Sequence, residues 1–420
     1  MMNKSHNFKE GFINFCQICY AKKIHQIMDL GYQPLADDLK DQSNTPSVSY
    51  PIKVFFCKKC RLLQNNFIVS DKKLYSKDYH YRPGISTTVV NNLRNMALKL
   101  ISLYSLKKND LIVDLGCNDG TLLNAFKSLG FKNVAGVEPT NIYKFAIKNG
   151  IMVINDFFNV KSAQIIKKKF GNAKLITTTN VFAHTGQLGE FIKGVKTLID
   201  NKIGVFVIEN HYLLDIIKKL QFDSFYHEHL RTYSLKSLIR LLNIYKFKPI
   251  NAFVTDRYNG NIQAHFVSEK NIIRTSTNIS KILNNEKKEG LDNIKTYLNF
   301  SDKIEKVKQR LFSYLNYNKN KLIIGKAYPA RASVILNYFN SLKDRLKLIA
   351  EQPTSLKINK YISGTSIKIV NSDIIKKIKP DIIIIFAWHL FHEIKNKWKK
   401  KGLSKKTKFV LLLPSLKIYK

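Results

Sequence analysis

The sequence lacks any long apolar run. No apolar stretch approaches the roughly 18 residues that a membrane-spanning helix requires, and no opening segment combines a basic start, an apolar run and a small-residue cleavage site. Low-complexity segments and short-period repeats are also absent, so nothing indicates a repeat architecture. The sequence therefore predicts a cytoplasmic protein without a membrane partner.

Acidic residues are scarce. The chain has 30 Asp and Glu against 70 Lys and Arg, a formal net charge of +40 over 420 residues. Such an excess can indicate nucleic acid, an anionic membrane surface or an acidic ligand. Here it is mostly lysine, is spread along the whole chain and accompanies abundant Asn and Ile, as a codon bias produces. We therefore do not expect nucleic acid as a partner, although a basic surface favours a phosphorylated small substrate.

Cysteines are few, at five, and four of them form two Cys-x-x-Cys pairs separated by 37 residues. Such usage suits a reducing compartment and metal binding better than disulfides. Two such turns can close a tetrahedral four-sulfur site, which predicts structural zinc on Cys16, Cys19, Cys57 and Cys60. The alternative, four reduced core cysteines, does not explain the spacing. We expect this ion to fold a small domain over residues 1–75 and to perform no chemistry.

The rest of the chain alternates apolar strand patterns with helical patterns. An amphipathic helix is expected between Gly84 and Ser105. Five strands are then expected in the segments DLIVDLG, FKNVAG, IMVIND, AKLITTT and GVFVIEN, and four more in KLIIGK, RLKLIAEQ, DIIIIFAW and KFVLLLP. This alternation predicts an α/β fold with helix-covered parallel sheets. One such domain would span residues 76–271, and a smaller one residues 272–420.

The loop after the first of these strands has features of a nucleoside site. Asp114 closes the strand, Gly116 and Gly120 allow a tight turn against a ligand, and Glu138 ends the next strand 24 residues after Asp114. An acidic residue there can accept both hydroxyls of a ribose. The spacing is not the Gly-x-Gly-x-x-Gly of pyrophosphate binding, so a nucleoside without phosphates fits better. An NAD-binding or merely structural α/β fold is the alternative.

This combination resembles motif I and the second-strand acid of class I S-adenosylmethionine methyltransferases. The resemblance implies S-adenosylmethionine as cofactor in a Rossmann-like domain, with the residue after the third strand contacting the adenine. The cofactor-binding residues that it implies are Asp114, Gly116, Asn118, Gly120, Glu138, Asp156 and Asn180.

The stretch FYHEHLRTYS places Tyr226, His227, Glu228 and His229 side by side in a chain with ten histidines. Alone, it fits a metal site, a buried polar cluster or a proton-handling site. The two histidines would share one face only on a strand, and no third metal ligand is evident nearby.

Taken in order along nearly the whole chain, these features resemble the sugar C-methyltransferases of deoxysugar pathways. The four cysteines and the segments DLGCNDGTLL, NVFAHTGQLGEF and FYHEHLRTYS carry the resemblance. Members of that family methylate a nucleotide-linked 4-keto-deoxysugar at carbon 3. The resemblance implies such a substrate, with its nucleotide held by the C-terminal domain.

Methylation at carbon requires an enolate, and therefore a base for the proton beside the ketone and a donor for the developing oxyanion. The resemblance implies that Tyr226, Glu228, His229, His184 and Tyr81 are catalytic. We expect His229 to remove the C3 proton and Tyr226 to polarise the enolate oxygen. His184 and Tyr81 would position the sugar or share the proton, and Glu228 would hold an imidazole or bind a sugar hydroxyl.

The sequence departs from the family mainly in the C-terminal domain. The segment GKAYPARAS has Tyr328 and Arg331 where the family has a turn rich in Gly and Ala, and Glu351 and His389 replace an aspartate and an asparagine. Nucleotide, sugar, methylated carbon and stereochemistry therefore stay open. The oligomeric state is also open, with a monomer favoured.

Two other functions fit parts of the sequence. A zinc-containing RNA methyltransferase would suit the +40 charge, but no Arg-rich aromatic platform and no Asn/Asp-Pro-Pro-aromatic tetrapeptide appears. A non-catalytic module on a degenerate methyltransferase fold would require loss of the cofactor loop or of the histidine and tyrosine set, and both are present.

Overall fold

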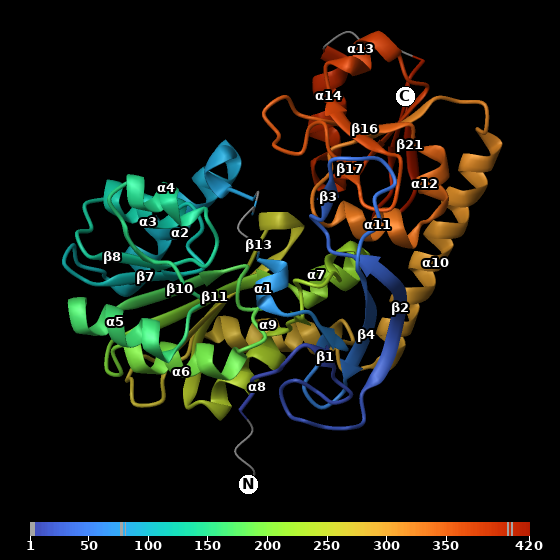
Figure 1. The fold of residues 1–420 in the computed structure, drawn as a ribbon. Helices are drawn as coiled ribbons and strands as arrows, with labels where there is room; N and C mark the ends of the chain where they lie inside the picture. The colour runs from blue at the N-terminus through green and yellow to red at the C-terminus, as the bar shows by residue number, and fades with distance from the viewer. Residues whose placement is uncertain (1–4, 76–78, 80, 401–402, 405) are drawn as a thin grey trace.

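The computed structural model describes residues 5–75, 79, 81–400, 403–404 and 406–420. Its three larger sheets belong to an N-terminal domain, a central α/β domain and a C-terminal α/β domain (Figure 1). The mixed α/β class predicted from the sequence is therefore confirmed. In the described ranges, no helix has both the length and the apolar character that crossing a membrane requires.

The N-terminal domain is an antiparallel sheet with the order β12-β5-β4-β2. Along β4, Ile52, Val54 and Phe56 are buried on alternate residues, the period that gives a strand one apolar face. The strands of this domain are β1 (Gly11–Phe12), β2 (His25–Pro34), β4 (Ser49–Cys57), β5 (Leu62–Asn65) and β6 (Phe67–Ile68), followed by the short helix α1 (Asp71–Leu74).

The central sheet has seven strands in the order β13-β14-β11-β10-β7-β8-β9. The first five along the chain pair in parallel, as the sequence pattern predicted, and the last two add an antiparallel pair that it did not. They are β7 (Ile112–Leu115), β8 (Val134–Val137), β9 (Met152–Ile154), β10 (Leu175–Thr179), β11 (Val205–His211), β13 (Phe247–Thr255) and β14 (Asn261–Ser268).

Helices cover both faces of this sheet, with α2, α3 and α4 above it and α5 and α6 below it in Figure 1. Helix α2 (Thr87–Tyr104) matches the predicted helix and buries Leu93, Met96 and Leu100. The others are α3 (Thr121–Ser128), α4 (Tyr143–Lys148), α5 (Val160–Phe170), α6 (Leu188–Leu198), α7 (Leu213–Lys218) and α8 (Leu235–Ile244), with the 3-10 turns η1 (Pro83–Ile85), η2 (Phe222–Ser224) and η3 (Arg257–Asn259).

The C-terminal sheet has the order β21-β20-β19-β15-β16-β18-β17-β3. All four predicted strands are present, as β15 (Ile323–Lys326), β16 (Leu348–Glu351), β19 (Ile382–Ile385) and β20 (Lys408–Leu411). The sheet also contains β17 (Tyr361–Ile362), β18 (Lys368–Asn371) and β21 (Lys417–Tyr419). The helices of the last third are α9 (Thr277–Lys288), α10 (Ile294–Tyr317), α11 (Ala332–Tyr338), α12 (Ser341–Arg345), α13 (Ile374–Ile378) and α14 (Phe391–Lys400), with the 3-10 turn η4 (Trp388–Leu390).

Short strands of one domain pair with the sheet of another domain. The N-terminal segment supplies β3 (Leu39–Lys40), which pairs with β17 at the edge of the C-terminal sheet. The central domain supplies β12 (Arg231–Thr232), which pairs with β5 of the N-terminal sheet. Helix α10 runs along the side of the molecule from the N-terminal to the C-terminal domain (Figure 1), and its Tyr297 stacks on Phe56 with ring centroids 4.0 Å apart. Each domain is therefore held by the other two.

Candidate active site

The four predicted zinc ligands lie together. Their sulfur atoms lie within 4.8 Å of one another, and Cys16, Cys57 and Cys60 are buried. Four converging thiols on two knuckle turns form the ligand set of a structural zinc site. Such a site has no open coordination position for a substrate. Among the described residues, this is the one group of three or more Cys, His, Asp or Glu side chains close enough to hold a metal ion.

A cavity of about 1330 Å³ is lined by residues of all three domains. Its walls include the loops that follow β7, β8, β9 and β10, the end of β11 at His211, the loop 226–229, and segments of the C-terminal domain. This position, outside the carboxyl ends of parallel strands, is where α/β folds bind ligands.

The loop after β7 forms one end of the cavity, and both glycines there have left-handed backbone angles. A Cβ atom on Gly116 would lie 2.5 Å from Val181, and one on Gly120 would lie 2.8 Å from the Cβ of Ala146. Packing within the protein thus requires both glycines. Gly116 lines the cavity, whereas Gly120 begins α3 behind it.

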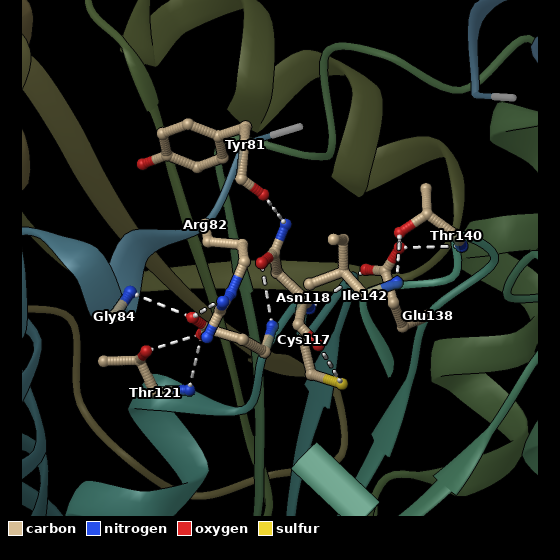
Figure 2. A network of polar contacts seen from close by, with 10 residues as sticks. Tyr81, Arg82, Gly84, Cys117, Asn118, Thr121, Glu138, Thr140 and Ile142 are labelled. Carbon is tan, nitrogen blue, oxygen red and sulfur yellow. Dashed lines mark hydrogen bonds and ion pairs between the residues drawn. The ribbon is translucent and has the colours of Figure 1, made fainter. Parts of the chain in front are cut away.

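Glu138 joins the loops that follow β7 and β8. One carboxylate oxygen accepts the Asn118 backbone N–H at 2.9 Å, and the other accepts the N–H and hydroxyl of Thr140 at 2.9 and 2.7 Å (Figure 2). Burial raises its pKa, while these hydrogen bonds act in the opposite direction. The carboxylate therefore keeps a fixed position at the cavity wall.

A second contact of Asn118 reaches the segment before α2. Its Nδ2 donates to the backbone carbonyl of Tyr81 at 3.1 Å, and Asp119 accepts the Gly84 N–H at 3.0 Å (Figure 2). The Tyr81 hydroxyl contacts that of Tyr258. Tyr81 thus lies at the end of the cavity that the loop after β7 forms.

Asp114 and Asn180 lie deeper in the same wall. Asp114 accepts the Thr177 hydroxyl at 2.7 Å, and burial raises its pKa to about 7. Asn180 has a left-handed backbone, and its Oδ1 accepts from Asn261 at 3.2 Å. Its Nδ2 is buried without a partner among the described residues, which leaves a donor at the cavity wall for a ligand.

Asp156 is not brought to the cavity. Its side chain is exposed and accepts the backbone N–H of Phe157 at 2.7 Å, within its own loop. Phe157 and Asn159 line the cavity at this point. Because this loop follows a strand end, it is predicted to border the site. The sequence does not show which of its side chains faces the cavity.

His229 lies in the loop 226–229, between η2 and β12. Its Nδ1 donates to the backbone carbonyl of Ser224 at 2.8 Å, and because a carbonyl only accepts, the lone pair of the neutral ring is on Nε2. Burial lowers its pKa to about 4. The ring of Tyr226 lies 4.1 Å away, centroid to centroid. Asn65 of β5 donates to the carbonyls of Tyr226 and His229 at 3.0 and 3.3 Å.

Glu228 is buried in the same cavity between charges from the other two domains. Burial is the main cause that raises its pKa to about 8; nearby Asp37 adds to the rise, and Lys357 opposes it. Lys357 in turn bonds Asp37 at 2.6 Å. Near neutral pH, Glu228 is therefore mostly a protonated carboxyl group that can donate a hydrogen bond.

His227 turns away from the cavity. Its Nε2 donates to the carbonyl of Tyr50 at 3.1 Å, and its ring packs edge-on against the Tyr50 ring. The two histidines of the HEH triplet thus point to different places. The metal reading of this triplet receives no support from the described residues.

His184, in the loop after β10, lies beside His229, with ring centroids 4.9 Å apart. Its partner is Tyr75, whose hydroxyl lies 2.9 Å from the His184 Nδ1 and whose ring is nearly parallel to the imidazole. The structure therefore places Tyr75, and not Tyr81, against the histidines. Tyr79 also lines the cavity and lies 6.0 Å from Tyr75. Tyr81 was the tyrosine predicted from this segment, and Tyr75, Tyr79 and Tyr81 lie too close along the chain to be told apart without the fold.

Two further groups at the cavity were not predicted from the sequence. His211 ends β11 with its ring centroid 5.1 Å from that of His229. Arg331 of the GKAYPARAS segment is buried and donates to Asp223 Oδ1 at 2.9 Å and Ser224 Oγ at 2.7 Å. Trp388 also donates to Asp223, at 2.8 Å. His211 is a polar residue at the end of a parallel strand, and this feature of the sequence could have identified it.

Comparisons with known proteins agree with this three-part architecture. Three family models match consecutive parts of the chain: a "zinc binding domain" over residues 16–75, a "Methyltransferase domain" over residues 91–251 and a "C-methyltransferase C-terminal domain" over residues 258–414. The chain thus carries, in this order, the three domains that these family models describe. It is an S-adenosylmethionine-dependent methyltransferase, and its four cysteines form a zinc site in the part matched by the zinc-binding model.

A curated relative spans the same length. It is the C-methyltransferase NovU of Streptomyces niveus, 24% identical over 412 residues that cover 97% of each chain. Among solved structures, magnesium protoporphyrin IX methyltransferase of Synechocystis is 13% identical, with a TM-score of 0.33 over 43% of this chain and 83% of that chain. A methyltransferase of Clostridium acetobutylicum is 14% identical, with a TM-score of 0.34 over 43% and 92%.

Proposed function

We propose that this C-methyltransferase deprotonates a nucleotide-linked 4-keto-deoxysugar at C3 and methylates the resulting enolate, as a step of deoxysugar biosynthesis. The observation that carries the proposal is the hydrogen bond from His229 to the Ser224 carbonyl, which leaves Nε2 as an unprotonated base in the cavity. A C-methyltransferase needs such a base, because a sugar carbon becomes a nucleophile only after losing a proton.

The cofactor end would be formed by Gly116, Asn118, Glu138 and Asn180. The fixed carboxylate of Glu138 suits ribose hydroxyls, and the unpartnered Asn180 Nδ2 suits a cofactor oxygen. S-adenosylmethionine supplies the electrophilic methyl group.

His229 would take the C3 proton on Nε2. The resulting imidazolium is a buried cation, and the face of Tyr226 at 4.1 Å stabilises it. The hydroxyl of Tyr226 and the protonated carboxyl of Glu228 are donors for the enolate oxygen or a sugar hydroxyl. His184, held by Tyr75, would complete the wall around the reacting carbon.

The opposite end of the cavity favours an anionic group. Lys326, Lys357, Lys397 and His389 of the C-terminal domain line it with the acidic Glu351 and Glu393, and Lys357 pairs with Asp37. Ammonium groups attract phosphate, so this end suits the diphosphate of a nucleotide sugar.

The test uses purified enzyme, a 4-keto-6-deoxy nucleotide sugar and deuterated water, with deuterium uptake at C3 and methyl transfer followed by mass spectrometry. We expect wild type to catalyse both, and His229→Asn to lose about 10²- to 10⁴-fold in both, the usual contribution of a general base. Asparagine can still donate to the Ser224 carbonyl, so the loop geometry is kept.

The matched control is His227→Gln, which preserves the donor to Tyr50 in the same loop but outside the cavity, and should retain wild-type rates. Uptake and transfer that survive in His229→Asn would refute the assignment of the base. Absence of both in wild type with bound cofactor would refute the substrate class.

A further inference from the structure

The C-terminal α/β domain repeats the strand arrangement of the central domain. Its parallel strands lie in the order β20-β19-β15-β16-β18, and those of the central sheet lie in the order β11-β10-β7-β8-β9. Counted along the chain within each domain, both orders read five, four, one, two, three. Such a sheet binds ligands outside the carboxyl ends of its strands, where the strand order reverses. In the C-terminal domain, the cavity is lined at this edge by Lys326, Glu351, Ser372 and Ala387.

The turn that follows the first strand has the same backbone in both domains. Gly116 follows β7 and Ala327 follows β15, and both have left-handed φ angles, of 73° and 63°. The Gly116 N–H donates to the carbonyl of Val137 at 2.8 Å, and the Ala327 N–H donates to that of Ala350 at 3.0 Å. Each of these carbonyls belongs to the residue just before a glutamate. The two turns are therefore structural equivalents.

Glu351 is the counterpart of Glu138. One of its carboxylate oxygens accepts the backbone N–H of Tyr328, in the turn, at 2.7 Å, and the other accepts the N–H of the next residue at 2.8 Å. Glu138 likewise accepts the N–H of Asn118 from its own turn with one oxygen and an N–H just beyond itself with the other. A carboxylate has about four acceptor positions, so each glutamate retains acceptor capacity for a ligand. The side chain of Glu351 is partly exposed at the cavity wall.

The surroundings of Glu351 restrict the kind of ligand that it suits. Lys326, Lys357 and Lys397 line the same end of the cavity and favour an anion, whereas a carboxylate repels one. Hydroxyl groups, in contrast, donate hydrogen bonds to a carboxylate. A ligand that carries a diphosphate beside a ribose matches both parts of this wall. In dinucleotide folds, an acid at the end of the second strand accepts the 2′-hydroxyl of a ribose.

We propose that Glu351 binds the 2′- and 3′-hydroxyls of the substrate's ribose, so that the sugar is carried by a ribonucleoside diphosphate and not by a 2′-deoxyribonucleoside diphosphate. The inference rests on the proposed function, in which a nucleotide occupies this end of the cavity, and adds the class of nucleoside and the residue that selects it. Selectivity follows because a site built to bind a hydroxyl rejects the analogue that lacks it.

The first experiment compares ribonucleotides with their deoxy forms by isothermal titration calorimetry. The ligands are UDP, CDP, GDP and ADP, each beside its 2′-deoxy form, and dTDP. Saturating S-adenosylhomocysteine keeps the Glu138 end of the cavity occupied. We expect the best-bound ribonucleotide to bind about 10- to 100-fold more tightly than its deoxy form, the range for a hydrogen bond to a charged group. Equal affinities within every pair, tightest binding of dTDP, or no binding by any of these ligands would overturn the proposal.

Glu351→Gln separates binding of the ribose from the support that this side chain gives to its turn. We expect the affinity for the ribonucleotide to fall about tenfold or more, because the charged acceptor is lost, while the affinity for the deoxy form stays within about twofold of wild type. A role confined to the turn would weaken both forms equally, and that result would overturn the proposal. The control is Asp373→Asn, an exposed residue just after β18 and outside the cavity lining, which should keep the wild-type ratio.

These titrations require neither the sugar nor turnover, so the two proposals can fail separately. Preference for a ribonucleotide by a protein that methylates no keto-sugar would support the ribose site and refute the proposed reaction. Methylation of a dTDP-linked sugar, without preference for a ribonucleotide in any pair, would support the reaction and refute the ribose site.

Discussion

His229 and Glu228 are adjacent, yet burial shifts their pKa values in opposite directions. It lowers that of His229 to about 4 and raises that of Glu228 to about 8, because in each case it disfavours the charged form. Near pH 7 the site therefore holds a neutral imidazole and a protonated carboxyl group. These are the protonation states that removing a carbon proton and stabilising an oxyanion require.

The pKa of Glu228 predicts how stability depends on pH. The folded protein keeps this proton up to about pH 8, whereas the unfolded chain loses it near its ordinary value of 4.5. The contribution of Glu228 to stability is therefore fully present below about pH 4.5 and is lost as the pH rises towards 8. Glu228→Gln lacks this loss.

We thus expect the melting temperature of Glu228→Gln, relative to wild type, to rise by a few °C between pH 5 and pH 8, measured by calorimetry at both values. Other titrating groups are common to both proteins and cancel in the difference. A constant difference across this range would contradict a raised pKa of Glu228.

Single residues also show what could and could not be predicted from the sequence. The resemblance to a known family pointed to His184 and His229, and the structure places both in the cavity. It chose Tyr81, whereas the tyrosine beside His184 is Tyr75. It missed His211, which has no neighbouring motif. Which side chain of a strand end or loop faces inward depends on packing between domains.

At the scale of elements, η2 is held by the C-terminal domain. Arg331 of the turn before α11 pairs with the fully buried Asp223, at 2.8 Å between Arg331 Nε and Asp223 Oδ2, and bonds the hydroxyl of Ser224. The carbonyl of that same Ser224 orients His229. The GKAYPARAS segment, which departs from a turn rich in Gly and Ala, therefore links the second α/β domain to η2 and the adjoining loop 226–229.

Arg331→Met should destabilise the protein by about 3–5 kcal/mol, because it leaves the carboxylate of Asp223 buried without its cation. Chemical denaturation measures this loss, and kcat should fall as the Ser224 carbonyl is released. Arg345→Met, which removes a hydrogen bond to the Asn318 carbonyl in the same domain, is the matched control and should cost about 1 kcal/mol. Equal effects of the two substitutions would contradict a special role for the Arg331 pair.

A strand could be predicted where its own sequence pattern was enough to identify it. The parallel strands β7, β8 and β15 are short, buried and largely apolar runs that the sequence shows directly. The two-residue strands β3 and β12 have no such signal, because each exists only through pairing with a strand of another domain. The antiparallel strands β13 and β14 come after the stretch 225–234. The alternation of strand and helix patterns did not predict them.

At the scale of the whole molecule, zinc stabilises more than its own domain. The N-terminal domain supplies β3 to the C-terminal sheet, β5 as the partner of β12, and Asn65 as a donor to the loop 226–229. Loss of the metal should therefore disturb the active site, although the zinc site has no open position for chemistry.

We expect about one zinc per chain by mass spectrometry of metals. Chelation, or Cys60→Ser, should lower the melting temperature by several °C and reduce methyl transfer at least tenfold, because a structural zinc contributes directly to folding. Cys117→Ser, at the buried fifth cysteine outside the zinc cluster, should keep its zinc. Full activity after complete removal of zinc would show that the N-terminal domain does not support the catalytic loop.

The most direct test of the central claim is the chemical position of the transferred methyl group. The enzyme is incubated with S-adenosylmethionine carrying a ¹³C-labelled methyl group and a 4-keto-6-deoxy nucleotide sugar, and the product is analysed by two-dimensional NMR. The account predicts a methyl group bonded to carbon, with a long-range correlation from its protons to the ketone carbon, and none in the product mixture of His229→Asn. A methyl group bonded to oxygen or nitrogen would contradict it, as would a labelled product of normal yield from His229→Asn.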